Sequence, residues 1–321
     1  MSFLPQNVLE FDPECTEFFL GGTTPNLPSI LVGGTVQDQN RYKPICQLFK
    51  YMKKKVVYNA YMFATLYDTF NRIPVFSAYT FTGVGSSGKR PDTWMIEPQL
   101  DGGEEPVMSL ETQGVIYTHQ AVNQDYDEYG QNKNLSKGHM FPKSFAHQPV
   151  NQSSTFTLTN SVPQVKTFNV GSWRKMECDV RKIILKQCLD NTGKPKAYVV
   201  TGAVPSDNNN TLNNRVNIPD LLWTAYCCYN NKKKEWMAEA HWGENQEEPN
   251  EKLLNSHTLA ELYDMLKHHY PGGDVQVFPD QCPRGSSQKE RGKSREREVG
   301  SGDVSRKGLL ECDEDCKCVS L

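Results

Sequence analysis

The sequence has no long apolar run and no marked excess of charge of one sign. None of its apolar stretches reaches the 18 residues that a membrane-spanning helix requires, so we expect no transmembrane segment. Residues 1–10 have neither a basic segment nor an apolar one after it, and they predict no signal peptide. With 35 Lys and Arg against 38 Asp and Glu, the formal net charge is −3. That balance excludes a strongly basic coating protein but not an enzyme, which needs only a local positive groove.

The sequence also lacks the cysteine and histidine spacings of zinc fingers and any other base-reading motif, so we expect no sequence specificity. Ten cysteines are many for a cytosolic enzyme without such a metal site, and they favour disulfide bonds in an oxidising compartment. Sequons at Asn134, Asn151 and Asn209 agree with a secretory route. The alternative is a set of buried free thiols in a reducing, intracellular compartment. The pairing of the cysteines and the oligomeric state do not follow from the sequence.

The length of 321 residues is sufficient for one large domain with a substantial core. We predict an N-terminal extension over residues 1–14, a single domain over 15–272, and a flexible, disordered tail over 273–321. From about residue 283 the composition changes to Ser, Gly, Lys, Arg and Glu with almost no apolar residues, which is typical of disorder.

The distribution of apolar residues predicts an α+β fold with a central antiparallel sheet. Residues 61–67 and 73–81 are rich in β-branched and aromatic side chains and flank a turn at 68–72, which predicts a hairpin. Residues 197–204 and 218–229 predict two further strands. Between 171 and 189 the apolar residues recur at helical spacing, so one stripe of that helix faces a core.

Four polar residues in the middle of the chain suit metal-assisted cleavage of a phosphodiester. His139 follows a glycine, and an imidazole can accept a proton from water near neutral pH. Asn160 follows it in the chain, and then Asn169 and Glu177 lie eight positions apart. Eight residues correspond to about 12 Å of helix rise and slightly more than two turns, so both side chains can face one cleft.

The same residues resemble a known family, the DNA/RNA non-specific endonucleases with a ββα-metal (His-Me finger) active site. His139 precedes Asn160 by 21 positions, Asn160 precedes Asn169 by nine, and Asn169 precedes Glu177 by eight. Residues 88–98 resemble the segment that carries the catalytic arginine of the family, which assigns that role to Arg90. Residues 63–81 resemble the vertebrate branch, the endonuclease domain-containing 1 proteins. The resemblance extends over roughly residues 12–270.

The resemblance implies a role for each residue and hydrolysis of DNA and RNA to products with 5′-phosphate ends. His139 would be the general base, and Asn169 the only direct protein ligand of a Mg²⁺ ion, with Mn²⁺ as the alternative cofactor. Glu177 would hold the waters bound to the metal, and Arg90 would offset charge that builds on the phosphate. Asn160 would orient the site. The resemblance also implies a secreted protein or one in the lumen of the endomembrane system.

One departure from the family pattern leaves a second function open. Relatives commonly have Asp-Arg before the Gly-His pair, whereas this chain has Ser136 and Lys137. A lysine still attracts phosphate, but as a point charge rather than a bidentate one. Because lysine can still hold the phosphate, we predict an active Mg-dependent nuclease with Lys137 in the site. The alternative is a catalytically impaired secreted or luminal member of the fold that binds nucleic acid or protein.

Three local patterns have two interpretations each. Asn169 alone is also a typical helix N-cap. Lys53, Lys54 and Lys55 beside aromatic residues are either part of a nucleic-acid track or a solvated turn. The acidic residues of 124–129 are either a solvated rim, which we favour, or additional metal ligands.

Overall fold

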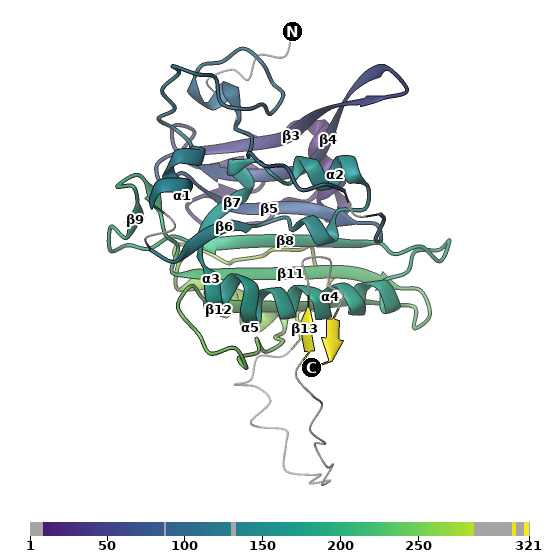
Figure 1. Cartoon of the computed structure of the whole chain (residues 1–321). Helices are drawn as coiled ribbons and strands as arrows, with labels where there is room; N and C mark the ends of the chain where they lie inside the picture. Colours follow the sequence, from purple (N-terminus) through teal and green to yellow (C-terminus); the bar gives the residue numbers. More distant parts are fainter. Residues whose placement is uncertain (1–8, 87, 130–132, 286–309, 313–317, 321) are drawn as a thin grey trace.

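The computed structural model describes residues 9–86, 88–129, 133–285, 310–312 and 318–320. Its centre is a six-stranded antiparallel sheet with the strand order β12-β11-β8-β5-β4-β3 (Figure 1). The six strands are β3 (Tyr42–Lys53), β4 (Val56–Asp68), β5 (Ile73–Phe81), β8 (Ala197–Val204), β11 (Leu221–Asn230) and β12 (Glu235–Glu244). The predicted fold class, α+β with a central antiparallel sheet, is confirmed.

Three predicted strands coincide with observed ones, and the fourth, over 218–229, corresponds to β11, which begins three residues later, at Leu221. Residues 61–67 lie within β4, residues 73–81 form β5, and residues 197–204 form β8. The turn between β4 and β5 is held by Asp68, whose Oδ1 accepts hydrogen bonds from the backbone N–H groups of Phe70 and Asn71. Arg41 donates to the same carboxylate from Nε and Nη2. A turn closed by an aspartate explains why the sequence signal for this hairpin was strong.

Both faces of the sheet are buried. Because side chains alternate along a strand, Phe63 and Tyr79 enter one core while their neighbours Ala64 and Ala78 enter the other. The first face is covered by a ββα unit: β6 (Leu135–His139), β7 (Ser161–Val165) and α4 (Arg174–Gln187), which crosses in front of the sheet in Figure 1. The second is covered by α5 (Leu259–Lys267) and by segments from both ends of the described domain.

The remaining elements are short. They comprise β1 (Leu31–Val32), β2 (Thr35–Val36), α1 (Asn123–Tyr129), α2 (Pro149–Ser154), α3 (Lys166–Phe168), β9 (Thr211–Leu212), β10 (Val216–Asn217), β13 (Leu310–Cys312) and β14 (Cys318–Ser320). The capping box expected before α5 is present, since Thr258 and Glu261 each accept a hydrogen bond from the backbone N–H of the other. Within the described residues, no helix combines the length and the apolar character needed to cross a membrane.

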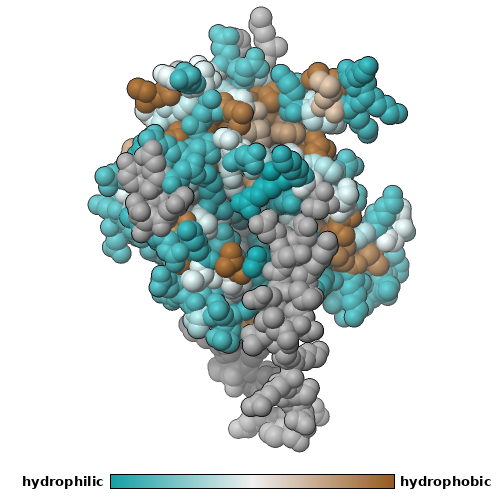
Figure 2. Space-filling view, in the orientation of Figure 1, coloured by the Kyte–Doolittle hydropathy of each residue, from teal (hydrophilic) through white to brown (hydrophobic). Residues whose placement is uncertain are grey.

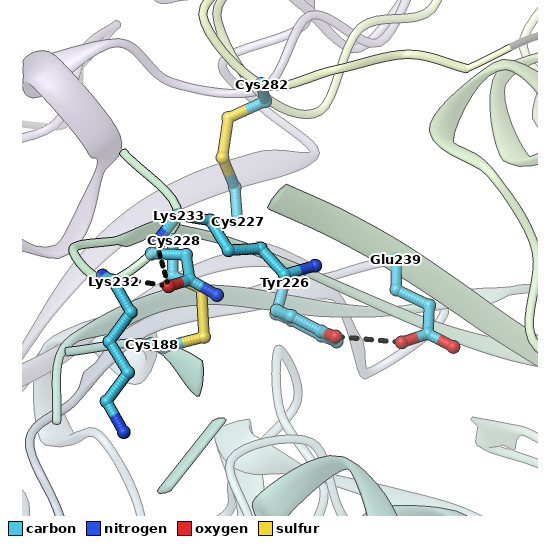
Figure 3. The surroundings of a disulfide bond; sticks show 9 residues. Cys188, Tyr226, Cys227, Cys228, Lys232, Lys233, Glu239 and Cys282 are labelled. Carbon is cyan, nitrogen blue, oxygen red and sulfur yellow. Dashed lines mark hydrogen bonds between the residues drawn. A yellow bond between two sulfur atoms is a disulfide. The ribbon is translucent and has the colours of Figure 1, made fainter. Parts of the chain in front are cut away.

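Disulfide bonds connect the sheet to both covering layers. Cys227 and Cys228 are consecutive in β11, so their side chains leave on opposite faces (Figure 3). Cys228 pairs with Cys188 at the end of α4, and Cys227 pairs with Cys282 near the end of the described domain. A third bond joins Cys15 to Cys46 in β3. Cys178 is disulfide-bonded as well.

The domain extends past the predicted boundary at residue 272. Val275, Val277 and Phe278 are buried in the second core, and Cys282 holds its segment to β11. The prediction of a disordered tail from 273 is therefore wrong for these residues, because their apolar side chains complete the cover over the sheet. It is also wrong for β13 and β14, which pair with each other. Residues 1–8 of the predicted extension, and 286–309, 313–317 and 321 of the predicted tail, lie outside the described residues.

The long segment between β5 and α1 is held in place by a buried glutamate. The backbone N–H of Glu97 donates to the side-chain oxygen of Gln120, and the Gln120 amide donates back to the Glu97 carbonyl oxygen. The Glu97 side chain is buried, and its carboxyl lies 3.5 Å from the hydroxyl of Thr157. Burial raises the pKa of Glu97 to about 8, although the hydroxyls of Thr157 and Thr159 oppose the shift.

Replacement of Phe278 tests the extended boundary. Phe278→Ala removes a ring that is 4% exposed and should lower the free energy of unfolding by about 3–5 kcal/mol, measured by denaturant titration. Phe70→Ala is the matched control, because its ring is 74% exposed and its loss should cost less than about 1 kcal/mol. Equal, small effects of both changes would show that the domain ends before Phe278.

The raised pKa of Glu97 predicts a pH-dependent stability. The folded state holds the proton up to about pH 8 and the unfolded state only to about 4.5, so this stabilisation is complete below pH 4.5 and is lost as pH rises through 8. Glu97→Gln removes the titration, and its melting temperature should rise relative to the wild type between pH 5 and 8. Glu104→Gln, at an exposed site of the same segment, is the control. A constant difference between Glu97→Gln and the wild type across this range would contradict the assignment.

Candidate active site

A cleft of about 700 Å³ opens on the first face of the sheet, beside the ββα unit. Its walls come from the segment after β5, from β6, from the segment after β6 and from the start of α4. Five of the six residues singled out in the sequence line it: Arg90, Lys137, His139, Asn169 and Glu177. The sixth, Asn160, lies behind the wall and is fully buried. The fold therefore brings residues up to 87 positions apart into one open space.

His139 is the last residue of β6 and lies between two aromatic rings. The Trp94 ring centroid is 4.6 Å from the imidazole, and the Phe156 ring meets it edge-on at 4.8 Å. The Nε2 atom is buried and has no hydrogen-bond partner among the described residues. Burial, together with the charges of Arg90 and Lys143, lowers the pKa of His139 to about 3. The imidazole is therefore neutral at physiological pH and available as a proton acceptor.

The glycine before His139 is required by the neighbouring strand. Gly138 faces Gln164 of β7, and a Cβ atom at Gly138 would lie 2.2 Å from the Gln164 side-chain oxygen and 2.7 Å from its Cβ. Any larger residue would push β6 away from β7. The Lys-Gly-His pattern thus reflects close packing of the two strands as well as chemistry.

Asn160 fixes the chain that follows His139. Its side-chain oxygen accepts from the Phe141 N–H and from the Ser77 hydroxyl of β5, and its amide donates to the carbonyl oxygens of Phe141 and Thr155. The Asn160 carbonyl oxygen accepts from the Met140 N–H. These bonds tie the histidine to the sheet, so Asn160 acts through position and does not line the cleft.

Asn169 lies in an irregular helical turn. Residues Asn169–Trp173 form a π-helical segment between α3 and α4, and such segments are frequent at functional sites. The Asn169 amide does not cap the helix, so the N-cap interpretation is wrong. Its Nδ2 donates to the Ser136 hydroxyl at 2.9 Å, which directs the amide nitrogen toward β6. The unusual turn decides where this amide lies.

A carboxylate from a distant loop holds this turn. The Glu248 side chain accepts a hydrogen bond from the Ser172 N–H at 2.8 Å. Gly171 departs from helical backbone angles beside it, and a Cβ atom there would lie 2.9 Å from the Glu248 carboxylate. Sequence analysis missed Glu248, because nothing in the local sequence links it to a helix that begins more than 70 residues earlier.

Glu177 lies in the first turn of α4, where its carboxyl accepts a hydrogen bond from the Trp173 indole N–H at 3.0 Å. Burial raises the pKa of Glu177 to about 8, while the indole and the charges of Arg174 and Arg181 act in the opposite direction. A cation bound near this carboxyl would favour its charged form.

The lining of the cleft is basic although the whole chain is slightly acidic. It contains five cationic residues, namely Arg90, Lys137, Lys143, Lys166 and Arg174, against Asp92, Asp127 and Glu177. Lys137 forms an ion pair with Asp127 at 2.8 Å and lies over the Tyr126 ring. The favoured interpretation of Asp127 as a rim residue agrees with its exposed side chain, whereas Asp125 is buried and accepts from the Val122 N–H.

Three cations were missed in the sequence. Arg174 precedes Glu177 by three positions on one helix, so its place on the same face could have been inferred. Lys143 gave no comparable signal, because it follows β6 in a short, irregular segment, whereas Lys166 lies directly between β7 and the turn that contains Asn169 and could have been inferred. Within the described ranges, no cluster of three or more His, Cys, Asp or Glu side chains could hold a metal ion.

Comparison with known proteins gives a consistent result. Residues 48–268 match the family described as DNA/RNA non-specific endonuclease. The Endonuclease domain-containing 1 protein of Homo sapiens is 31% identical over 222 residues, covering 67% of this chain and 39% of that protein. The protein of the same name from Mus musculus is 30% identical, covering 67% and 38%. This chain thus matches well under half the length of these relatives.

A solved structure titled "Crystal structure of the EndoG/EndoGI complex: Mechanism of EndoG inhibition" is also similar, with 17% identity and a TM-score of 0.49 over 73% of this chain and 87% of that chain. Because the family match spans more than half of the 321 residues, this chain belongs to the DNA/RNA non-specific endonuclease family.

Proposed function

We propose that this protein is a metal-dependent endonuclease that hydrolyses DNA and RNA without sequence specificity. The observation that carries the proposal is the convergence of Arg90, His139, Asn169 and Glu177 on one basic, open cleft. Family membership agrees with nuclease chemistry, and the positive lining suits a polyanionic substrate.

The donor groups in the cleft suit a hard divalent cation such as Mg²⁺. The Asn169 amide oxygen and the Glu177 carboxylate are oxygen donors, and Mg²⁺ commonly binds one or two protein groups while it keeps several waters. Asn169 would bind the ion directly, and Glu177 would hold its waters. The hydrogen bond from Asn169 Nδ2 to Ser136 leaves the amide oxygen for this purpose. The bound ion would supply positive charge to the phosphate as a Lewis acid.

His139 accepts a proton from the attacking water in this proposal. Its neutral imidazole is held by Trp94 and Phe156, and since Nε2 is buried, we assign proton acceptance to Nδ1. The water oxygen forms a bond to phosphorus while the bond from phosphorus to the 3′ oxygen breaks. The products are a 5′-phosphate and a 3′-hydroxyl: the departing 3′ oxygen takes a proton from solvent, and the imidazole later releases the proton that it accepted to solvent.

Arg90 stabilises the negative charge that develops on the phosphate. Its guanidinium lies 5.7 Å from the centroid of the Phe156 ring, whose edge meets His139, so the base and the arginine flank one aromatic side chain. Lys137 adds a point charge where relatives commonly have arginine. These positions allow one phosphate group to contact the arginine while water faces the imidazole.

The disulfide bonds support an oxidising compartment for the protein. Cys15, Cys46, Cys188 and Cys228 are bonded in two pairs, and Cys227 and Cys282 form a third. Such bonds form in secreted proteins and in the endomembrane lumen. We infer that the enzyme acts there rather than in the cytosol.

Substitution of the base and of the metal ligand tests the function. His139→Ala and Asn169→Ala should each lower the rate of cleavage of supercoiled plasmid and of single-stranded RNA by about 10²-fold or more, with magnesium present. A chelator should abolish cleavage by the wild type. His268→Ala, which changes an exposed histidine after α5, should retain full activity.

A folded wild-type protein that cleaves neither substrate with Mg²⁺, Mn²⁺ or other divalent ions would contradict the proposal. That result would favour the non-catalytic binding protein. Circular dichroism of each variant separates loss of chemistry from loss of fold.

The hydrogen bond between Asn169 and Ser136 predicts a specific metal dependence. Ser136→Ala removes the acceptor that orients the amide, so the magnesium concentration for half-maximal activity should rise about tenfold. Ser136→Asp restores an acceptor and should recover much of the affinity. Ser153→Ala, whose exposed hydroxyl donates to the Pro149 carbonyl oxygen outside the cleft, is the matched control. Unchanged magnesium dependence in Ser136→Ala would show that this bond does not orient the ligand.

A further inference from the structure

The ends of β3 and β4 form a hairpin that projects from the body of the molecule, at the upper right of Figure 1. We call residues 50–59 the arm. At its root, Phe49, Tyr51 and Ala60 still pack against the first core, whereas residues 52–59 are all exposed. From the buried Met62 to the tip at Lys55 is seven residues, or about 23 Å at 3.3 Å per residue. The arm therefore reaches well beyond the surface of the domain.

The charge of the arm has one sign. It carries Lys50, Lys53, Lys54 and Lys55, and it has no acidic residue. Among the described residues, no ion pair involves these four lysines. Their charges are uncompensated within the fold, so the arm is complementary to a polyanion.

The tip has a backbone conformation that does not suit lysine. Lys53 pairs with Val56, so Lys54 and Lys55 are the two loop residues, and both have positive φ, 49° and 66°. Two-residue hairpin loops of this kind strongly favour Asn-Gly, and a left-handed lysine costs about 1 kcal/mol or more. Lysine at both positions is the less stable choice, which points to a use for the charges at the tip.

Apolar side chains lie beside the lysines. Met52 is 71% exposed, and Val56 and Val57 are 51% and 56% exposed. The rings of Tyr51 and Tyr58 stack across the strands, 5.5 Å apart. Figure 2 shows hydrophobic and hydrophilic residues next to one another over this part of the molecule. An elongated ligand with a charged backbone and planar, less polar groups would contact both kinds of side chain.

The root of the arm is connected to the wall of the cleft. Helix α2 packs against β3, and Gln152 of α2 bonds the segment that leads to Arg90: its side-chain oxygen accepts from the Gly88 N–H, and its amide donates to the Ser86 carbonyl oxygen. The arm thus starts from the side of the cleft that carries Arg90. A polymer that leaves the cleft past Arg90 would continue toward the arm.

We propose that the arm is a second contact for nucleic acid, which binds the phosphate backbone outside the cleft and takes no part in the chemistry. This inference rests on the proposed nuclease function, and it predicts that the enzyme prefers long nucleic-acid substrates. The roughly 23 Å from Met62 to the tip correspond to about seven base pairs at 3.4 Å per pair, so a duplex that reaches the tip extends at least that far along the arm. The basic, lysine-tipped surface favours nucleic acid over an anionic membrane, because the apex that would enter a bilayer first carries two charges.

The test is binding of the full chain to DNA in the presence of a chelator, which prevents cleavage. Lys54→Asn/Lys55→Gly installs the favoured turn, so the variant should fold at least as well as the wild type. Its Kd for a 30-base-pair duplex should rise about tenfold, and the slope of log K against log salt should fall by about 2. Its Kd for a DNA hairpin of six base pairs should change less than about twofold.

The chain supplies a matched control at another hairpin. Lys232 and Lys233 lie in the turn between β11 and β12, where Lys233 is 3.6 Å from Glu235. Lys232→Gln/Lys233→Gln removes the same charge and should leave the Kd for the duplex within about twofold. An equal loss of affinity for the duplex in this control would show that the effect of the arm variant comes from overall charge, and it would overturn the proposal.

Two further outcomes would overturn the proposal. In the first, the arm variant binds the duplex with the affinity of the wild type. In the second, the arm variant loses the binding to phosphatidylserine vesicles that the wild type shows, while its binding to DNA is unchanged. Cleavage is measured separately. A wild type that binds DNA through the arm but never cleaves it would contradict only the proposed nuclease function. An arm variant that binds and cleaves long DNA as the wild type does would contradict only this inference.

Discussion

Burial of both faces of the central sheet is the constraint on which the rest of this structure depends. Each strand sends alternate side chains into two separate cores, so each core needs its own cover. The ββα unit supplies one and the terminal segments with α5 supply the other. The adjacent Cys227 and Cys228 follow the same alternation and attach each cover covalently to one strand. The active-site cleft exists because the first cover is made of short, irregular pieces rather than a continuous layer.

Hydrogen bonds that attach the backbone near His139 and Asn169 to neighbouring elements also give these two side chains a defined position. Asn160 bonds the chain after His139 to β5, and Glu248 holds the irregular turn that contains Asn169. Neither residue needs to touch a substrate. Buried polar groups of this kind are costly unless they are hydrogen-bonded, and the bonds that Asn160 and Glu248 make hold the backbone near His139 and Asn169 in place.

Charge is distributed unevenly: the chain as a whole is slightly acidic, whereas the cleft and the arm are locally basic. The formal net charge of −3 keeps nonspecific attraction to polyanions low, while the five cations of the cleft and the four of the arm concentrate positive potential on limited areas. Inside the cleft, burial keeps His139 neutral beside these cations. A neutral imidazole beside these cations is possible because Trp94 and Phe156 pack against it.

The sequence by itself determined the local elements and singled out five of the residues that line the cleft, but not Lys143, Lys166 or Arg174. Strand alternation and the turn at Asp68 depend on neighbours in the chain, and they were predictable for that reason, as was the spacing of His139, Asn169 and Glu177. Only the tertiary structure decided the contacts between distant segments. It buried Asn160 behind the wall, placed Glu248 against the helix turn, fixed Gly138 against Gln164 and carried the core past residue 272. These contacts arise from packing of whole elements, which no local pattern of residues encodes.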